Sequence, residues 1–251
     1  MNSFFQYAIL GIVQGITEWL PISSDGHLVL AHAWLGVPTN LAFDVFLHLG
    51  SLIVILIYFR TDIVRLIRAL GRPSEVADRN LIGRIIVATF FTVAIALLIN
   101  PYMEQLQTVR VAAIFFIVTG IFVGMHKFIR AKASSLTWGK TIFLGLAQGL
   151  AVLPGLSRSG SMLGWGLALG LKKEEAFRFT FLAAIPAIAG AFLFEIRHLQ
   201  IQPIYWVGFI VTIIVGYLSL MALELVLKRD RLWIFSLYTI ILGVVLLCFA
   251  R

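Results

Sequence analysis

Two stretches of the chain, 11–27 and 145–160, repeat each other in edited form and place polar residues inside apolar sequence. At one constant offset, identical residues recur as Gly11 and Gly145, Gln14 and Gln148, Gly15 and Gly149, Ser23 and Ser157, and Gly26 and Gly160. Such a duplication constrains the fold to two related halves, each with an interrupted apolar segment. It also indicates where the function lies, since one copy supplies Glu18 and His27 and the other supplies Arg158.

The composition predicts an all-α polytopic membrane protein. The chain is 60% hydrophobic with a mean hydropathy of +0.97, well above a soluble domain. Several apolar stretches reach about 18 residues or more, enough to cross a hydrocarbon core. The single Cys248 allows no intramolecular disulfide and makes a thiolate metal cluster implausible. No Lys or Arg precedes Arg60, so the basic start of a cleavable signal peptide is missing.

The apolar pattern predicts six full spans and two broken segments in a single integral domain covering 1–251. The six spans are expected at about 41–59, 81–99, 108–126, 177–194, 204–226 and 234–250. The broken segments, about 3–35 and 141–171, contain Pro, Gly and several Ser. Non-helical backbone at membrane depth is tolerated only inside protein or beside a wet cavity. Each broken segment is therefore predicted to be a re-entrant helix–loop–helix hairpin.

The distribution of charge tests this topology. The net charge is +8, and the basic residues are expected in short loops between spans, which argues against nucleic acid as a partner. With the predicted spans, 16 of the 20 Lys and Arg residues fall on one side, in the segments 60–84, 127–140, 172–178 and 228–231. The positive-inside rule makes that side cytoplasmic and places both termini outside.

The same topology predicts an inverted repeat. Repeat 1 covers about 1–126 and repeat 2 about 140–251, each with one hairpin and three spans. An odd number of crossings inverts the second half, so the first hairpin enters from the outer face and the second from the cytoplasmic face. In this architecture two broken elements meet near the midplane and form one site.

Ionisable groups inside apolar segments are costly and usually functional. Glu18 lies four residues after Gln14, so both project from one helical face. A Glu at the headgroup level is an equally good explanation of Glu18 alone, but the repeated motif favours function. Arg158, between two apolar half-helices, needs an anionic partner, and its planar fork suits phosphate oxygens. A structural ion pair with Glu18 is the competing explanation.

The run from Ser23 to His27 predicts an anion site at a helix N-terminus. Ordinary N-capping explains one Ser or Asp there, but not the whole run with His27. Ser24 is a candidate nucleophile, and His27 a candidate base or nucleophile. His32 has a mostly structural interpretation, and His48 is a weak candidate.

Together these residues predict phosphoryl chemistry, which needs positioning and neutralisation of spread charge. Arg158 would clamp phosphate, with Ser157, Ser159 and the loop amides as further donors. Glu18 could act as acid/base or help to hold a divalent ion. No Walker motif or nucleotide fingerprint is present, so ATP is disfavoured and a lipid phosphate is favoured.

These residues resemble the undecaprenyl-diphosphate phosphatase family, also called the BacA or bacitracin-resistance family, over the full length of the chain. Gln14 and Glu18 match the family's first motif. A second element is matched by Pro21, Ser23, Ser24, Gly26 and His27, and a third by Pro154, Gly155, Ser157, Arg158 and Ser159. The stretch Leu49-Gly50-Ser51 is also similar to the family.

The resemblance implies removal of the terminal phosphate of undecaprenyl diphosphate to give the monophosphate carrier lipid for envelope glycans. It implies a divalent cation, Mg²⁺ or Ca²⁺, and a site open to the outer face of the cell membrane. The residues and the resemblance together predict Glu18, Ser24, His27 and Arg158 as catalytic and Glu18 as a metal contact, and the carboxylate of Asp25, which the family does not usually have, could also bind the metal. The expected substrate-binding residues are Gln14, Ser23, Ser157, Ser159, Gly155 and Gly160.

Two departures and one alternative accompany this prediction. Asp25 occupies a position usually held by a small hydroxyl residue, and Met162 stands where the family commonly has Thr, with Ser161 beside it. The alternative function is a polyprenyl-phosphate transporter or flippase without hydrolysis, because broken helices in inverted repeats are also a transporter architecture. A flippase would need Arg158 but not both Ser24 and His27. The sequence allows a homodimer as well as a monomer.

Overall fold

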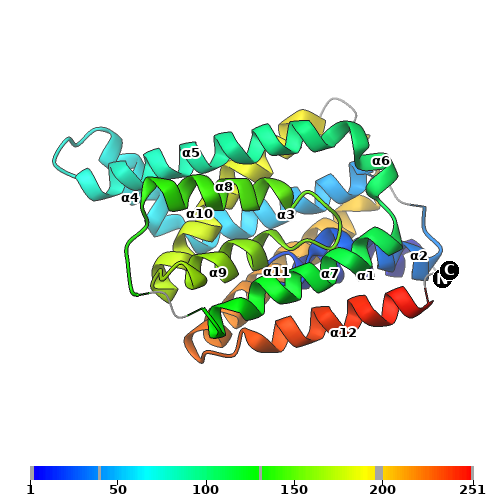
Figure 1. The fold of residues 1–251 in the computed structure, drawn as a ribbon. Coiled ribbons are helices and arrows are strands. Elements are labelled where there is room, and N and C mark those ends of the chain that lie inside the picture. The colour runs from blue at the N-terminus through cyan, green and yellow to red at the C-terminus, as the bar shows by residue number, and fades with distance from the viewer. Residues whose placement is uncertain (1–2, 39–40, 130–131, 196–199, 250–251) are drawn as a thin grey trace.

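The structure is a computed structural model that describes residues 3–38, 41–129, 132–195 and 200–249. These residues form a bundle of helices without a β-strand among them (Figure 1). The elements in chain order are α1 (Ser3–Thr17), α2 (Ser24–Leu35), α3 (Leu41–Tyr58), α4 (Arg60–Leu70), α5 (Val76–Ile99), η1 (Asn100–Tyr102), α6 (Met103–Leu106), α7 (Val109–Gly124), η2 (Met125–Lys127), α8 (Trp138–Leu150), α9 (Arg158–Ala168), α10 (Lys173–Glu195), α11 (Tyr205–Lys228) and α12 (Trp233–Phe249). The expectation of an all-α protein is confirmed.

Four of the described helices are long and apolar enough to cross a membrane. They are α5 with η1, α7 with η2, α10 and α11. The remaining two predicted spans correspond to α3, which forms a pair with α4 bent by 75°, and to α12, which is apolar but has 17 residues. Large apolar side chains are exposed along many of these helices, as expected for surfaces that face lipid.

The two broken segments form helix–loop–helix hairpins that enter the bundle from opposite ends (Figure 1). The helices α1, α2, α8 and α9 have 15, 12, 13 and 11 residues. At 1.5 Å per residue each is about 16–23 Å long, shorter than the roughly 30 Å hydrocarbon core. The loop of the first hairpin, 18–23, contacts the start of α9 in the second, since Ser159 Oγ donates to the carbonyl oxygen of Leu20 over 3.1 Å.

The two hairpins pack in matching ways, each against a helix of the other half of the chain. Helix α1 packs on α11, and α8 packs on α5. A Cβ atom on Gly11 would lie 2.4 Å from the Gly208 carbonyl oxygen, so only glycine permits this approach. A threonine of the partner helix then donates to the glycine carbonyl over 3.1 Å in both copies, from Thr212 to Gly11 and from Thr92 to Gly145. The sequence repeat therefore extends to tertiary packing.

The connections rich in Lys and Arg lie at one end of the bundle. Helix α4, the end of α7 and start of α8, the α9–α10 turn and the α11–α12 turn are all at the left of Figure 1, whereas α1 begins and α12 ends at the right. The sequence analysis predicts short loops for these basic residues, but the structure places several of them on helices, including Lys140 on α8 and Arg178 on α10. Arg65 and Arg68 lie on α4 and Arg84 on α5, because the chain after α3 continues as a separate amphipathic helix.

Candidate active site

The first hairpin loop ends in a strained residue that starts α2. Ser23 has φ 71° and ψ 106°, a left-handed conformation that costs energy outside glycine. Its Oγ atom accepts the backbone N–H of Gly26 over 3.4 Å and so caps the helix. One serine of the run is therefore an N-cap, and Ser24, the next residue, is free to project into the site.

The second loop is held by Thr119 of α7 so that α9 begins at Arg158. Thr119 Oγ1 donates to the carbonyl oxygen of Gly155 over 2.7 Å and accepts the N–H of Ser157 over 2.8 Å. Ser157 Oγ then accepts the N–H of Gly160 over 3.0 Å and caps α9. Gly155 has φ 88°, where glycine is favoured. The loop thus places the Arg158 side chain at the contact between the hairpins.

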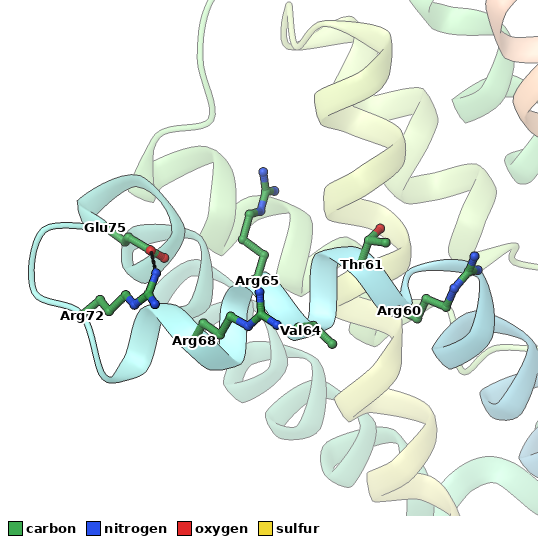
Figure 2. Close-up of a pocket in the computed structure, with 7 residues that line it drawn as sticks. All are labelled: Arg60, Thr61, Val64, Arg65, Arg68, Arg72 and Glu75. Carbon is green, nitrogen blue, oxygen red and sulfur yellow. Dashed lines mark hydrogen bonds and ion pairs between the residues drawn. The ribbon is translucent and has the colours of Figure 1, made fainter.

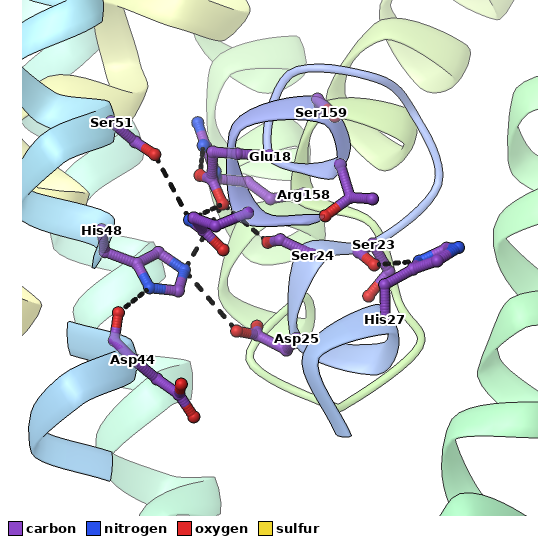
Figure 3. A network of polar contacts seen from close by, with 12 residues as sticks. Glu18, Ser23, Ser24, Asp25, His27, Asp44, His48, Ser51, Arg158 and Ser159 are labelled. Carbon is purple, nitrogen blue, oxygen red and sulfur yellow. Dashed lines mark hydrogen bonds and ion pairs between the residues drawn. The ribbon is translucent and has the colours of Figure 1, made fainter. Parts of the chain in front are cut away.

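Glu18 is the centre of the polar network in Figure 3 and is only 4% exposed at its side chain. Arg158 donates from one guanidinium nitrogen to Glu18 Oε1. The other carboxylate oxygen, Oε2, accepts hydrogen bonds from Ser24 Oγ over 2.6 Å and from Gln14 Nε2 over 3.1 Å. The structure therefore brings Gln14, Glu18, Ser24 and Arg158 together, from both halves of the chain.

Arg158 also has spare donor capacity in this setting. Its second terminal nitrogen, NH1, is buried and has no hydrogen-bond partner among the described residues. A buried unpaired guanidinium N–H is costly. The ion pair with Glu18 and a free donor for an anion thus coexist in one side chain, so the two interpretations of Arg158 given by its sequence context are compatible.

His48 of α3 joins the site beside Glu18 and Asp25 (Figure 3). Its Nε2 atom lies 3.4 Å from Glu18 Oε2 and 3.6 Å from Asp25 Oδ1. Its Nδ1 atom lies 2.8 Å from the carbonyl oxygen of Asp44. A carbonyl oxygen only accepts, so Nδ1 carries a proton. If Nε2 carried no proton, its lone pair would face two carboxylates. The geometry therefore favours a ring protonated at both nitrogens, the imidazolium form.

His27 is placed away from Glu18 and Ser24 (Figure 3). Its Nδ1 donates to the Ser23 carbonyl oxygen over 2.7 Å, and its Nε2 accepts the hydroxyl of Tyr238 over 2.8 Å. Its ring also stacks on Tyr238 and meets the edge of Phe116. The sequence suggests no packing role for His27, but the structure gives it one. Its predicted catalytic role remains a prediction.

The other predicted contacts fall into supporting positions. Ser157 and Ser159 are each 1% exposed, and their hydroxyl oxygens lie 3.2 Å apart. Both are occupied in holding the two loops rather than pointing outward. His32, interpreted as structural, is 3% exposed with its Nε2 3.0 Å from Asp44 Oδ1. Met162 is buried, and the Oγ atom of Ser161 is buried without a partner among the described residues.

The donors fit a divalent cation shared with substrate better than a cation held by protein alone. Among the described residues there is no group of three or more His, Cys, Asp or Glu side chains that could hold a metal ion. Mg²⁺ is usually bound by one or two carboxylates together with substrate phosphates and waters. Glu18 and Asp25 supply two carboxylates around His48 Nε2, and the Asp25 side chain is 46% exposed.

Sequence reasoning underrated three residues that complete the site. His48 and Ser51 project from one face of α3, three residues apart, and Ser51 Oγ accepts Gln14 Nε2 over 3.3 Å. Two polar residues three positions apart in an apolar helix are the sequence signal by which His48 and Ser51 could be found. Thr119 has no such signal, because a threonine in an apolar helix is common and only its loop contacts reveal its role.

Comparison with known proteins gives consistent matches. Residues 7–245 match the family model described as bacitracin resistance protein BacA. A protein from Methanobrevibacter smithii named undecaprenyl-diphosphatase is 40% identical over 96% of this chain and 95% of its own length. Proteins of the same name from Treponema denticola and Alcanivorax borkumensis are 38% and 37% identical, covering 96% and 97% of this chain and 95% and 98% of their own.

Proposed function

The chain belongs to the bacitracin resistance protein BacA family, and from this premise we propose how its site removes a phosphate. The chain is a multi-pass membrane hydrolase that cleaves the terminal phosphate from undecaprenyl diphosphate and leaves the monophosphate carrier lipid. One observation carries the mechanism: a buried carboxylate, Glu18, holds both a serine hydroxyl and an arginine.

Ser24 is the proposed nucleophile and Glu18 the acceptor of its proton, since their oxygens are 2.6 Å apart. Attack by Ser24 Oγ on the terminal phosphorus forms a serine–phosphate bond and breaks the bridging P–O bond, releasing polyprenyl monophosphate. Water then displaces Ser24, which regains its proton from Glu18. The water oxygen stays on phosphorus, and both protons of the water leave with the product as dihydrogen phosphate.

Arg158 is the proposed phosphate clamp. The terminal phosphate would accept a hydrogen bond from its unpaired NH1, while the hydrogen bond from NH2 to Glu18 fixes the guanidinium plane. Fixed donors aimed at developing charge in a site shielded from water are a large source of catalysis. Gln14 and His48 contact Oε2, the carboxylate oxygen that does not bind Arg158.

A divalent cation is part of the proposal, with Glu18 and Asp25 as its protein ligands and substrate phosphate completing its shell. When bound, the cation would neutralise phosphate charge. The test of the whole function is phosphate release from C55 diphosphate by purified protein, with and without EDTA. Release that EDTA abolishes and added Mg²⁺ or Ca²⁺ restores is expected. Lipid-phosphate translocation without phosphate release would overturn hydrolysis in favour of a flippase.

We also propose that the two halves are inverted repeats of six spans and two re-entrant hairpins, 1–126 and 140–251 in one domain. The opposite entry of the hairpins and the paired packing of Gly11 and Gly145 support this. The concentration of basic residues at one end makes that end cytoplasmic, so both termini and the opening of the site face outward. Single cysteines at positions 2 and 251, in a Cys248→Ser background, should react with an impermeant reagent in intact cells. Protection of both would overturn the topology.

A further inference from the structure

Helix α4 leaves the bundle in a direction that suits a membrane surface. The axes of α3 and α4 meet at 75° across a one-residue break at Phe59. Because α3 is an apolar helix of the bundle, a helix bent this far from it runs close to the membrane plane. Figure 1 shows α4 at the end of the bundle where the basic connections gather.

The inner face of α4 is fixed to the bundle. Leu66 and Ala69 are buried. Asp62 of α4 pairs with Arg178 Nε of α10 over 2.7 Å, and Arg65 Nε pairs with Asp78 Oδ2 of α5 over 3.3 Å. These ion pairs join three helices and offset the charge of Arg65. The position of α4 is therefore set by the fold and does not depend on an external partner.

The outer face of α4 combines arginine with exposed apolar residues. Arg60, Val64, Ile67 and Arg68 lie at a spacing that puts them on one side of the helix. Val64, Ile67 and Leu70 are between 44% and 66% exposed. Apolar side chains flanked by arginine on a short surface helix are typical of a helix that lies in the headgroup region of a bilayer.

A hollow on this face gathers positive charge (Figure 2). It is lined by Arg60, Thr61, Val64, Arg65, Arg68, Arg72 and Glu75. Arg72 pairs with Glu75 over 3.3 Å, and Arg60 donates to the Ile57 carbonyl oxygen over 3.1 Å. The guanidinium of Arg68 makes no hydrogen bond or ion pair within the described part of the chain. Arg65 is paired with Asp62 and Asp78, and Arg72 with Glu75, so the uncompensated positive charge of the hollow comes from Arg60 and Arg68.

We propose that this hollow binds the phosphate headgroup of an anionic phospholipid while Val64, Ile67 and Leu70 dip into the acyl region. Guanidinium forks match phosphate oxygens, and their long stems let the charge stay at headgroup depth. The exposed apolar residues on the same face select a lipid over a free anion, which would leave them in water. This site is separate from Glu18 and Arg158 and is independent of the proposed hydrolysis.

The depth of α4 is tested first. An environment-sensitive fluorophore is attached at Ile67→Cys in a Cys248→Ser background, and the protein is placed in vesicles of phosphatidylglycerol and phosphatidylcholine. A label at Arg229→Cys, in the α11–α12 turn at the same end, is the matched control. The label at 67 should be quenched by lipid-borne quenchers and that at 229 by aqueous iodide. Equal quenching of both by iodide would overturn the proposal.

Headgroup selectivity is tested with spin-labelled phosphatidylglycerol against spin-labelled phosphatidylcholine. Near the surface each basic residue changes the association of anionic lipid about fivefold, so Arg68→Gln should lower the preference for phosphatidylglycerol by about that factor. The triple variant Arg60→Gln/Arg68→Gln/Arg72→Gln should lose it. A charge-matched triple variant, Arg79→Gln/Arg229→Gln/Arg231→Gln, should keep it, and phosphate release in detergent confirms that each variant is folded.

Three results would overturn the lipid assignment. The first is an unchanged phosphatidylglycerol preference in Arg68→Gln and in the triple variant of the hollow. The second is an equal loss in the charge-matched control, which would show that only net charge at this end matters. The third is displacement of phosphatidylglycerol by inorganic phosphate, which would identify a site for the free anion.

Discussion

Gly155→Ala should disable the enzyme through geometry alone, because a Cβ atom at this position has no room. It would lie 2.1 Å from the carbonyl oxygen of Ala112 on α7, whereas real Cβ atoms essentially never come within 3.0 Å of such a neighbour. The loop or α7 must therefore move by about 0.9 Å, the difference between these distances. The same loop carries Arg158 to Glu18, so the displacement reaches the site.

The magnitude follows from two separate costs. A left-handed conformation in alanine costs about 1–2 kcal/mol, and forcing extra volume into a packed interior costs about 1–3 kcal/mol more. A misplacement of about 1 Å at catalytic groups can lower turnover by about 10²-fold. Gly155→Ala should therefore lose stability of about 2–5 kcal/mol in sum and most of its phosphate release.

Gly36→Ala is the matched control. Gly36 also has a positive φ of 62°, but no heavy atom lies within 4 Å of its added Cβ. This variant should pay only the conformational cost, with a melting temperature lower by about 2–8 °C and normal turnover. Thermal unfolding and phosphate release are measured in the same detergent for both variants. Wild-type turnover in Gly155→Ala, or equal losses in both variants, would refute the argument that the clash displaces Arg158.

Four further substitutions probe the chemistry. Arg158→Lys keeps the charge but loses the planar fork, so phosphate release should fall about 10²–10³-fold with the melting temperature retained; near-normal turnover would remove Arg158 from the clamp. Ser24→Ala should lower turnover by about 10³-fold or more, and His27→Ala by less, because its imidazole does not reach Glu18. An equal loss in His27→Ala, with a double variant no worse than either alone, would show that His27 acts together with Ser24. His48→Ala should cost about 10–100-fold in turnover by releasing Glu18 and Asp25; unchanged kcat and KM would show that His48 does not position them.

Much of the fold could be predicted from local sequence because its signals are local. Pro21 and Pro154 with their neighbouring Gly and Ser break two apolar segments, and the structure has a loop at both places. The repeated residues predict that the two breaks play related roles. The contacts of Thr212 with Gly11 and Thr92 with Gly145 are consistent with that relationship.

The short amphipathic helix α4 lies between two predicted spans, in a segment for which the sequence analysis predicts a loop, although its amphipathic pattern is present in the sequence. Its arginines resemble loop charges because the apolar spans on either side give a much stronger signal than an 11-residue helix. Whether such a segment folds as a helix is decided by its inner face, where Leu66 packs and where Asp62 pairs with Arg178 more than 100 residues away in the chain.

The sequence by itself identified the candidates for the chemistry: Glu18, Ser24 and Arg158 stand out because polar groups are costly in apolar segments. Only the tertiary structure decided which of them meet. Ser24 and His27 are three residues apart, yet Ser24 faces Glu18 while His27 turns to Tyr238 on α12. His48 reaches Glu18 from a different helix. Sequence spacing sets the order of side chains around a helix, but the side that faces the site depends on how distant helices pack against it.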